Sequence, residues 1–313
     1  MLDVFLLAVP LYLLISAGFA VVRSGYLPPE NLGGVGQFAL KVCLPVLIFA
    51  AVSKPGALMA LNWRFVAGYS AGSLLLIAAM ALAMMRAFGH PPGRAVILGL
   101  GCGSSNSAFF GLPVAAIALG PDRAATIFAW ILLAENMIVI PLCVSLAESI
   151  ETRSASFLHA LRAVLAGMAR SPLMIALVAG LAVSVTGIEP PEPLARSMSM
   201  IVTAAPVMSL MLVGGFIAHE DIRGAGLPSA VITLAKLVAH PLAVWLVLSA
   251  LPGLDHATVI GGVLYAGVPM FTIFTLFAAR HGGETLASAA QVLATVLSLL
   301  TINGLLFLTI PGL

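Results

Sequence analysis

The stretch 99-GLGCGSSNS-107 interrupts an apolar segment with small and polar residues, and 267-GVP-269 interrupts another in the second half of the chain. A forward shift of 162 positions superposes Gly99 on Gly261, Phe109 on Phe271 and Gly120 on Gly282, and a shift of 161 superposes Pro45 on Pro206. The nearly constant shift and the matched interruptions predict a duplicated unit with one broken helix in each copy.

The amino-acid composition indicates that this chain lies in a membrane. Of its 313 residues 61% are hydrophobic and only 8% are charged, with a mean hydropathy of +1.13. Soluble domains carry roughly 25% charged residues, so we predict an all-α integral membrane protein. The apolar runs are continuous and about as long as the ~20 residues that cross a bilayer as a helix. They lack the alternation of an outer-membrane barrel.

Polar and Pro/Gly clusters divide the chain into ten predicted spans, five per copy. The predicted spans are 2–22, 35–53, 65–87, 94–119, 124–147, 172–187, 196–217, 227–250, 257–280 and 285–310. The units are then a first repeat at 1–147, a surface connection with an amphipathic turn at 148–171, and a second repeat at 172–313. Because each repeat has an odd number of spans, the second enters from the opposite side and the repeats are inverted.

Basic residues predict the orientation. One set of loops carries Arg23, Arg86, Arg94, Arg153, Arg162, Arg170, Arg223 and Arg280, and the other carries Lys54, Arg64, Arg123 and Arg196. The positive-inside rule places the first set, with the connection, in the cytoplasm and both termini outside a plasma or inner membrane. The first span follows Asp3 with no basic residue and reads as a retained span, not a cleaved signal.

The two breaks are the predicted binding site. Freed backbone groups in hydrocarbon need partners in protein or water, and two equivalent breaks in inverted copies would cross near the midplane, aiming positive half-helix ends at one point. The expected binding residues are Ser104, Ser105, Asn106, Ser107, Val268, Pro269, Met270 and Thr272, and the helix-breaking prolines are Pro45, Pro113, Pro206 and Pro269. The alternative is that the small residues only allow close helix packing.

Three ionisable residues fall deep in predicted spans, namely Lys41, Glu135 and Lys236. Such charges are costly unless they are paired or hydrated, so each is a functional candidate. Glu135 is the candidate proton carrier, and a structural ion pair with Lys236 is its alternative. His240 lies one turn after Lys236 on the same face, and Lys41 can also extend toward the interface.

The sequence gives little support for a disulfide, a metal site, nucleic-acid binding or enzymatic catalysis. The three cysteines lie in apolar segments without ligand spacing, so neither disulfide nor metal is implied, and no cofactor beyond a coupling ion, H⁺ or alternatively Na⁺, is expected. No basic run indicates nucleic acid. No nucleophile and base share helical spacing and no phosphate-cradling loop is found, so we predict no catalytic residues and no enzyme.

Several motifs carry a family resemblance: Leu44-Pro45, Asn106 with Gly111-Leu112-Pro113, Val268-Pro269, and the run from Ala287-Ser288 to Thr301. With these the chain resembles the auxin efflux carrier family, whose bacterial members include malonate and malate permeases. The resemblance implies inverted five-span repeats, a scaffold from spans 1, 2, 6 and 7, a moving domain from the rest, a crossover of spans 4 and 9, and organic anions as substrates. Ser105 replaces a common proline, Lys41 is an unusual charge, and the long loop of plant members is missing.

The expected function is therefore secondary transport of a small carboxylate, such as a dicarboxylate or an auxin-like acid, by elevator-type alternating access. The substrate would dock near Asn106 and Pro269 while Glu135 exchanges a proton. The partners are the anion and the bilayer, and a homodimer through the scaffold helices is left open. Two rivals remain, a sodium-coupled symporter of the bile acid carrier type and a membrane sensor that binds a ligand without moving it. An intramembrane enzyme ranks below both.

Overall fold

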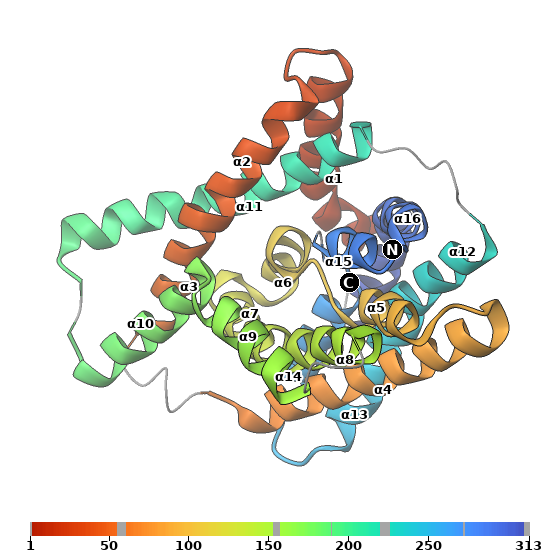
Figure 1. The fold of residues 1–313 in the computed structure, drawn as a ribbon. Coiled ribbons are helices and arrows are strands. Elements are labelled where there is room, and N and C mark those ends of the chain that lie inside the picture. The colour runs from red at the N-terminus through yellow and green to blue at the C-terminus, as the bar shows by residue number, and fades with distance from the viewer. Residues whose placement is uncertain are drawn as a thin grey trace.

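A computed structural model describes residues 2–54, 61–152, 157–188, 190–219, 226–271 and 273–309 of the chain, and within these ranges the fold is entirely helical (Figure 1). The helices are α1 (Leu2–Arg23), α2 (Leu32–Phe38), α3 (Leu44–Val52), α4 (Trp63–Phe88), α5 (Pro92–Gly103), α6 (Leu112–Leu119), α7 (Pro121–Leu133), α8 (Ile140–Thr152), α9 (Phe157–Ala169), α10 (Pro172–Thr186), α11 (Glu192–His219), α12 (Leu227–Leu234), α13 (His240–Ala250), α14 (His256–Ala266), α15 (Phe274–Arg280) and α16 (Glu284–Thr309).

In the part of the chain that the structure describes, five short helical turns accompany these helices, and most of them join two helices into a longer rod. A 3₁₀ turn, η1 (Pro29–Asn31), precedes α2, and wider π-helical turns form η2 (Ala39–Cys43), η3 (Ser107–Gly111), η4 (Ala134–Val139) and η5 (Ala235–Ala239). The turn η2 joins α2 to α3, η3 leads into α6, η4 joins α7 to α8, and η5 joins α12 to α13. π-Helical turns leave the regular i→i−4 bonding pattern and are frequent at functional sites.

Local sequence explains where several helices begin and end. The side chain of Asn62 caps α4 by accepting from the Phe65 N–H, and Ser171 caps α10 by accepting from Met174. Such caps satisfy amides that the first turn leaves free. At the other end of α4, Gly89 adopts the left-handed conformation with φ of +69°, which glycine enters without steric cost.

Seven helical stretches within the described residues are long and apolar enough to cross a membrane, and the bent pair α9 and α10, at 70° to one another, makes an eighth candidate. Helices also occupy the other predicted spans. In α1, which has 22 residues, the stretch Val9–Arg23 counts as a shorter apolar helix on this measure, α10 has 15 residues, and the ninth span is divided into α14 and α15. The described part of the chain thus has about seven or eight membrane-crossing helices on this measure, and the count of ten inverted spans stays a prediction.

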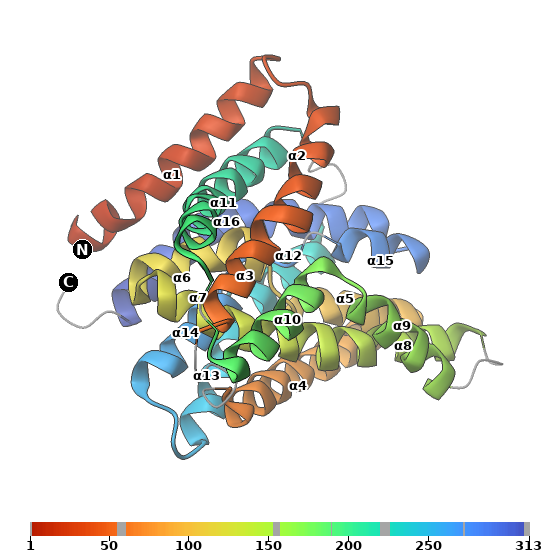
Figure 2. The same ribbon diagram turned by 90° about the vertical axis from the view of Figure 1, so that its left-hand side faces the viewer.

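The helices pack in two groups (Figures 1 and 2). In the first, α1 lies along α11 and α10 lies along α3, which also contacts α11. A Cβ on Gly18 would lie 2.0 Å from the carbonyl oxygen of Met211, and one on Gly214 only 1.8 Å from that of Ile15, so these glycines let α1 and α11 touch through their backbones.

The second group consists of α4 to α8 and α12 to α16, with α5 packed against α4, α8 and α15. The stretch Pro92–Leu119, which contains the first predicted break, is the most deeply buried of the seven candidate spans. This is the environment in which irregular backbone is tolerated in a membrane protein. The predicted connection at 148–171 is largely helical, since α8 continues to Thr152 and α9 follows.

Candidate functional site

Both predicted breaks are present, and they touch. Residues 104–106 separate α5 from η3, and residues 267–273 separate α14 from α15. The backbone N–H of Asn106 donates to the carbonyl oxygen of Pro269 at 2.8 Å. Thr272, a predicted site residue in the second break, lies outside the described residues.

The helix that follows the first break begins at this contact. Asn106 is its N-cap, and its Oδ1 accepts from the backbone N–H of Phe109 at 3.3 Å. Among the described residues no acceptor faces the N–H groups of Ser107 and Ala108. A helix N-terminus carries a partial positive charge, so free donors and a favourable dipole meet beside the contact.

Glu135 lies behind the first break, in the π-helical turn η4. Its side chain is only 5% exposed. Oε1 accepts from the Ser105 N–H at 2.9 Å and from the Tyr69 hydroxyl at 3.2 Å, and Oε2 accepts from the Ser107 hydroxyl at 3.2 Å. The carboxylate therefore binds the backbone and a side chain of the broken segment directly.

Lys236 lies on the other side of the first break, in the π-helical turn η5, and is fully buried. Its Nζ donates to the Ser105 hydroxyl at 2.7 Å and to the Ala266 carbonyl at 2.7 Å, and it lies 2.8 Å from His240 Nδ1. Ala266 is the last residue of α14, so the ammonium holds a carbonyl that the second break leaves without a helical partner.

Ser105 connects the two charged side chains. Its N–H binds Glu135 and its hydroxyl oxygen binds Lys236, while no direct ion pair between Glu135 and Lys236 is present in this described network. The structural ion pair considered from the sequence is therefore replaced by a bridge through the broken segment.

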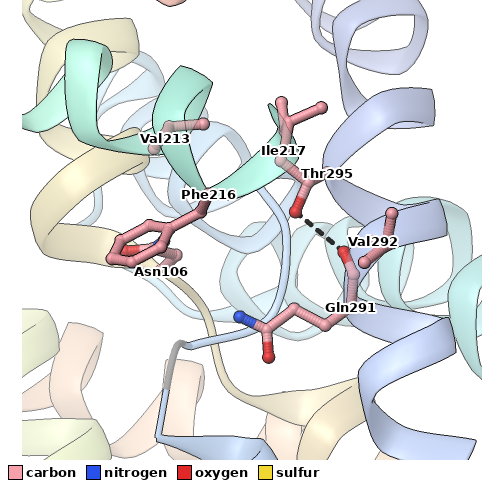
Figure 3. A pocket seen from close by; sticks show the side chains of 7 residues that line it. All are labelled: Asn106, Val213, Phe216, Ile217, Gln291, Val292 and Thr295. Atoms are coloured by element: carbon pink, nitrogen blue, oxygen red, sulfur yellow. Dashed lines mark hydrogen bonds between the residues drawn. The ribbon is translucent and has the colours of Figure 1, made fainter. Parts of the chain in front are cut away.

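A small pocket lies next to the contact of the two breaks (Figure 3). Its volume is about 30 Å³, and its lining consists of Asn106, Val213, Phe216, Ile217, Gln291, Val292 and Thr295. Asn106 comes from the first break, the next three residues from α11, and the last three from α16. The pocket thus lies between the two groups of helices.

Comparison with known proteins identifies the family. The sequence model of a family described as "Membrane transport protein" matches residues 3–306. The chain belongs to the auxin efflux carrier family of membrane transport proteins. A Rhizobium meliloti (strain 1021) protein described as "Putative malonate transporter" is 28% identical over 317 residues, covering 98% of this chain and 96% of the relative.

Membership in this family confirms the resemblance drawn from the sequence motifs. The protein is a multi-pass membrane transporter and not an enzyme. The contact between the breaks and the polar network around Ser105 are accordingly features of a transport protein.

The remaining predicted residues lie apart from the pocket. Val268 and Met270 are fully buried in apolar clusters, and the hydroxyl of Ser104 is buried with no partner among the described residues. Lys41 is exposed on its helix and donates to Gln37 at 3.1 Å, so the structure does not bring it to Glu135 or Lys236.

The predicted helix-breaking prolines differ in their effect. Pro269 lies within a true break, Pro113 lies in the first turn of α6, and Pro206 lies inside the continuous helix α11. Pro45, in the first turn of α3, follows the π-helical turn η2 without an interruption of the rod. As far as the structure describes the ten predicted spans, only the fourth and the ninth are therefore fully interrupted.

The glycines of α5 that precede the first break serve close packing, the alternative weighed from the sequence. A Cβ on Gly101 would lie 2.4 Å from the Phe274 ring, and one on Gly99 would lie 2.6 Å from the Ile77 carbonyl oxygen. Within the stretch 99–107 the glycines thus allow close helix packing, whereas Ser105, Asn106 and Ser107 make the polar contacts.

The sequence did not single out Tyr69, Ser73 or Gln291. Tyr69 and Ser73 are buried one turn apart on α4, where Tyr69 binds Glu135 and the Ser73 hydroxyl lies 2.9 Å from His240 Nε2. Their i, i+4 spacing within an apolar span was the available signal. Gln291 could have been noticed as a polar residue within an apolar stretch of α16.

Proposed function

We propose that the protein is a secondary active transporter of a small organic anion, a dicarboxylate in the first instance, that binds where the two broken helices meet. The observation that carries this proposal is the bond from the Asn106 N–H to Pro269, with a pocket lined by Asn106 beside it. Broken helices that meet between internal repeats are the usual architecture of a transporter binding site.

The chemistry of the junction favours an anion. The N-terminus of the helix beginning at η3 presents the N–H groups of Ser107 and Ala108, and the Asn106 amide adds N–H donors. Donors at a helix N-terminus suit a carboxylate. The name of the Rhizobium meliloti relative indicates malonate, which makes malonate the first substrate to test.

The packing of the helices supports alternating access by an elevator-type movement. In this proposal the spans form two inverted five-span repeats, α1, α3, α10 and α11 are the scaffold, and α4 to α8 with α12 to α16 move as one body. The pocket lies on the boundary, because α11 forms one wall while α16 and the first break form the other. Sliding of the second group would carry the bound anion past α11.

A second pocket offers a route to this boundary. It has a volume of about 480 Å³ and lies between α3, α11 and the α6–α7 region, with Lys54 and Asp122 among its lining residues. Lys54 and Asp122 form an exposed ion pair of 2.8 Å that links the end of α3 to the start of α7. We assign this pocket to substrate entry from the side that the loop charges place outside.

Glu135 is the proposed proton carrier. It is buried, it touches the broken segment at Ser105 and Ser107, and all its bonding partners donate to it. A protonated carboxyl has fewer acceptor sites than a carboxylate, so gain of a proton would loosen its hold on the break. That loosening would couple protonation to movement of the substrate site.

The sodium-coupled rival is disfavoured by Lys236. Na⁺ would need oxygen ligands at the junction, and the Ala266 carbonyl and the Ser105 hydroxyl are already bound by the Lys236 ammonium. A fixed ammonium supplies the positive charge that a coupling cation would otherwise bring. A sensor that binds without transport remains the rival from another class.

A flux assay in proteoliposomes tests the proposal. Uptake of labelled malonate is measured with pH and sodium gradients imposed separately, beside protein-free vesicles. Accumulation driven by a pH gradient and independent of sodium supports the proposal. Saturable binding without accumulation would assign the protein to the sensor class, and accumulation that requires sodium would favour the symporter.

A further inference from the structure

Gln291 is a half-buried polar residue to which the proposed function gives no role. It lies on α16 and points into the pocket that holds Asn106 and Phe216 (Figure 3). Its side-chain Oε1 is buried, and no described residue donates to it. In the interior of a membrane protein an unsatisfied amide is costly, so its position needs an explanation.

The neighbours of Gln291 leave its side-chain amide free. The Thr295 hydroxyl, one turn later on α16, donates to the main-chain carbonyl of Gln291 at 2.7 Å. That bond uses the hydroxyl proton of Thr295, which can therefore offer only lone pairs to the pocket. Val213 and Ile217 from α11 line the opposite wall with apolar atoms. Any hydrogen bond to the amide must come from what enters the pocket.

An amide group selects a particular partner. A carboxamide presents one acceptor oxygen and N–H donors side by side, whichever way it is turned. A carboxylate can accept from it but cannot donate to its oxygen. A carboxyl group that keeps its proton both donates and accepts, as does a primary amide, and each can pair with Gln291 through two bonds.

We propose that Gln291 recognises the second polar end of the substrate, a group that both donates and accepts hydrogen bonds, such as the protonated carboxyl of a half-ionised dicarboxylic acid. This inference rests on the proposed function, in which the ionised carboxylate lies at Asn106 and the start of η3. One anionic end at the break and one neutral acid end at Gln291 would then define the substrate.

The volume of the pocket agrees with a single acid group. A cavity needs roughly 10–15 Å³ to hold one water, and this pocket measures about 30 Å³. The space therefore suits the two oxygens of one carboxyl group. The rest of the substrate would extend toward the free amides of Ser107 and Ala108.

Ligand pairs that differ only in the second group test the proposal. Labelled malonate uptake is competed with malonate monoamide, which donates and accepts at its second end, and with monomethyl malonate, whose ester only accepts. Wild type should prefer the monoamide by about ten-fold or more, the effect of one lost hydrogen bond that leaves a buried acceptor unpaired.

The variants remove the amide without removing its bulk. In Gln291→Leu the preference should fall to within about two-fold, because neither bond can form. Gln291→Met, which keeps the length of the side chain, serves as a second variant in case Gln291→Leu fails to fold. Gln37→Leu makes the same chemical change on the exposed face of α2 and should keep the wild-type preference.

Binding to purified protein in detergent, followed by calorimetry with the same ligands, separates the two proposals. A preference for the monoamide that depends on Gln291 supports the recognition proposal even if malonate is never accumulated, an outcome that would remove only the transport mechanism. Equal binding of the monoamide and the ester to wild type overturns the assignment. A preference that survives Gln291→Leu and Gln291→Met overturns it as well.

Discussion

Asn106 and Pro269, 163 positions apart, are joined by a hydrogen bond of 2.8 Å from the backbone N–H of one to the carbonyl oxygen of the other. Each break thus supplies a partner for a backbone group that the other leaves outside a helix. Lys236 does the same for the Ala266 carbonyl at the end of α14. The junction satisfies the requirement that irregular backbone in a membrane be paired within the protein.

Asn106→Ala should reduce transport at least about ten-fold while the protein stays folded. The change removes the amide donors from the pocket and also the N-cap of η3, a cap that contributes about 1 kcal/mol to stability. Asn62→Ala removes an equivalent cap from α4, where Oδ1 accepts from Phe65 at 3.1 Å, away from the pocket. Uptake and thermal unfolding are measured for both variants. Equal transport by the two would remove Asn106 from the binding site.

Glu135→Gln should flatten the pH dependence of uptake, because an amide cannot exchange the proton that couples the broken segment to movement. The amide still accepts at one oxygen but not at both, so a bond to Tyr69, Ser105 or Ser107 is lost. Glu284→Gln, at the exposed first turn of α16, is the control. Initial rates are compared across a pH series with a substrate of fixed charge. A variant with the wild-type pH profile contradicts the proton role.

Lys236→Met should destabilise the protein by about 3–5 kcal/mol, the usual effect of removing one member of a buried charged network. The Ser105 hydroxyl and the Ala266 carbonyl would each lose their ammonium donor. Lys54→Met breaks an exposed ion pair and should change stability by less than about 1 kcal/mol. Unfolding in detergent provides the measurement. Similar losses in the two variants would show that the buried ammonium is not structural.

Asp255 gives a prediction for acid conditions at the loop before α14. Hydrogen bonding to the Thr258 side chain, followed by that to Arg123, lowers the pKa of Asp255 to about 2. The unfolded value is about 3.9, so the charge stabilises the fold above about pH 4, and this contribution disappears as the pH falls through about 2.

Asp255→Asn keeps the cap and removes the charge, so it should be less stable than wild type at pH 7 by under about 1 kcal/mol, since the side chain is partly exposed. The difference should shrink between pH 4 and pH 2. Melting temperatures across this range test it, with Asp122→Asn, 87% exposed, as the comparison. A difference that does not change with pH contradicts the prediction.

Gly214→Ala should destabilise the packing of α1 on α11 by about 1–3 kcal/mol, because its Cβ would overlap the Ile15 carbonyl oxygen. Gly167→Ala, on α9, meets nothing within 4 Å and should be neutral or stabilising by up to about 1 kcal/mol. Thermal unfolding of the two variants measures this difference in stability. If both behave alike, the backbone contact between α1 and α11 is not close in solution.

The sequence predicted much of the fold, because hydrophobicity along a membrane chain is a local property. Apolar runs bounded by Pro and Gly fixed the helical class, and the interruptions at Ser104–Asn106 and Gly267–Pro269 are present as breaks. The connection at 148–171 was underestimated, because the polar residues at 148–156, followed by His159 and Arg162 within α9, keep this stretch from forming a continuous apolar run.

The candidate site was predicted in part. Asn106, Pro269, Glu135 and Lys236 were all named from the sequence, since a deep charge or a break in an apolar span is visible in one dimension. The sequence could not show that Ser105 bridges Glu135 and Lys236, because these residues come from three different rods.

By itself the sequence determined that this chain is helical, lies in a membrane and is interrupted twice, since each of these follows from the solvation of short segments. Only the tertiary structure decided which groups meet. It placed Lys41 on an exposed face and brought Gln291 beside Asn106. Contacts between distant rods depend on how their side chains pack against one another, and no local pattern of residues encodes that packing.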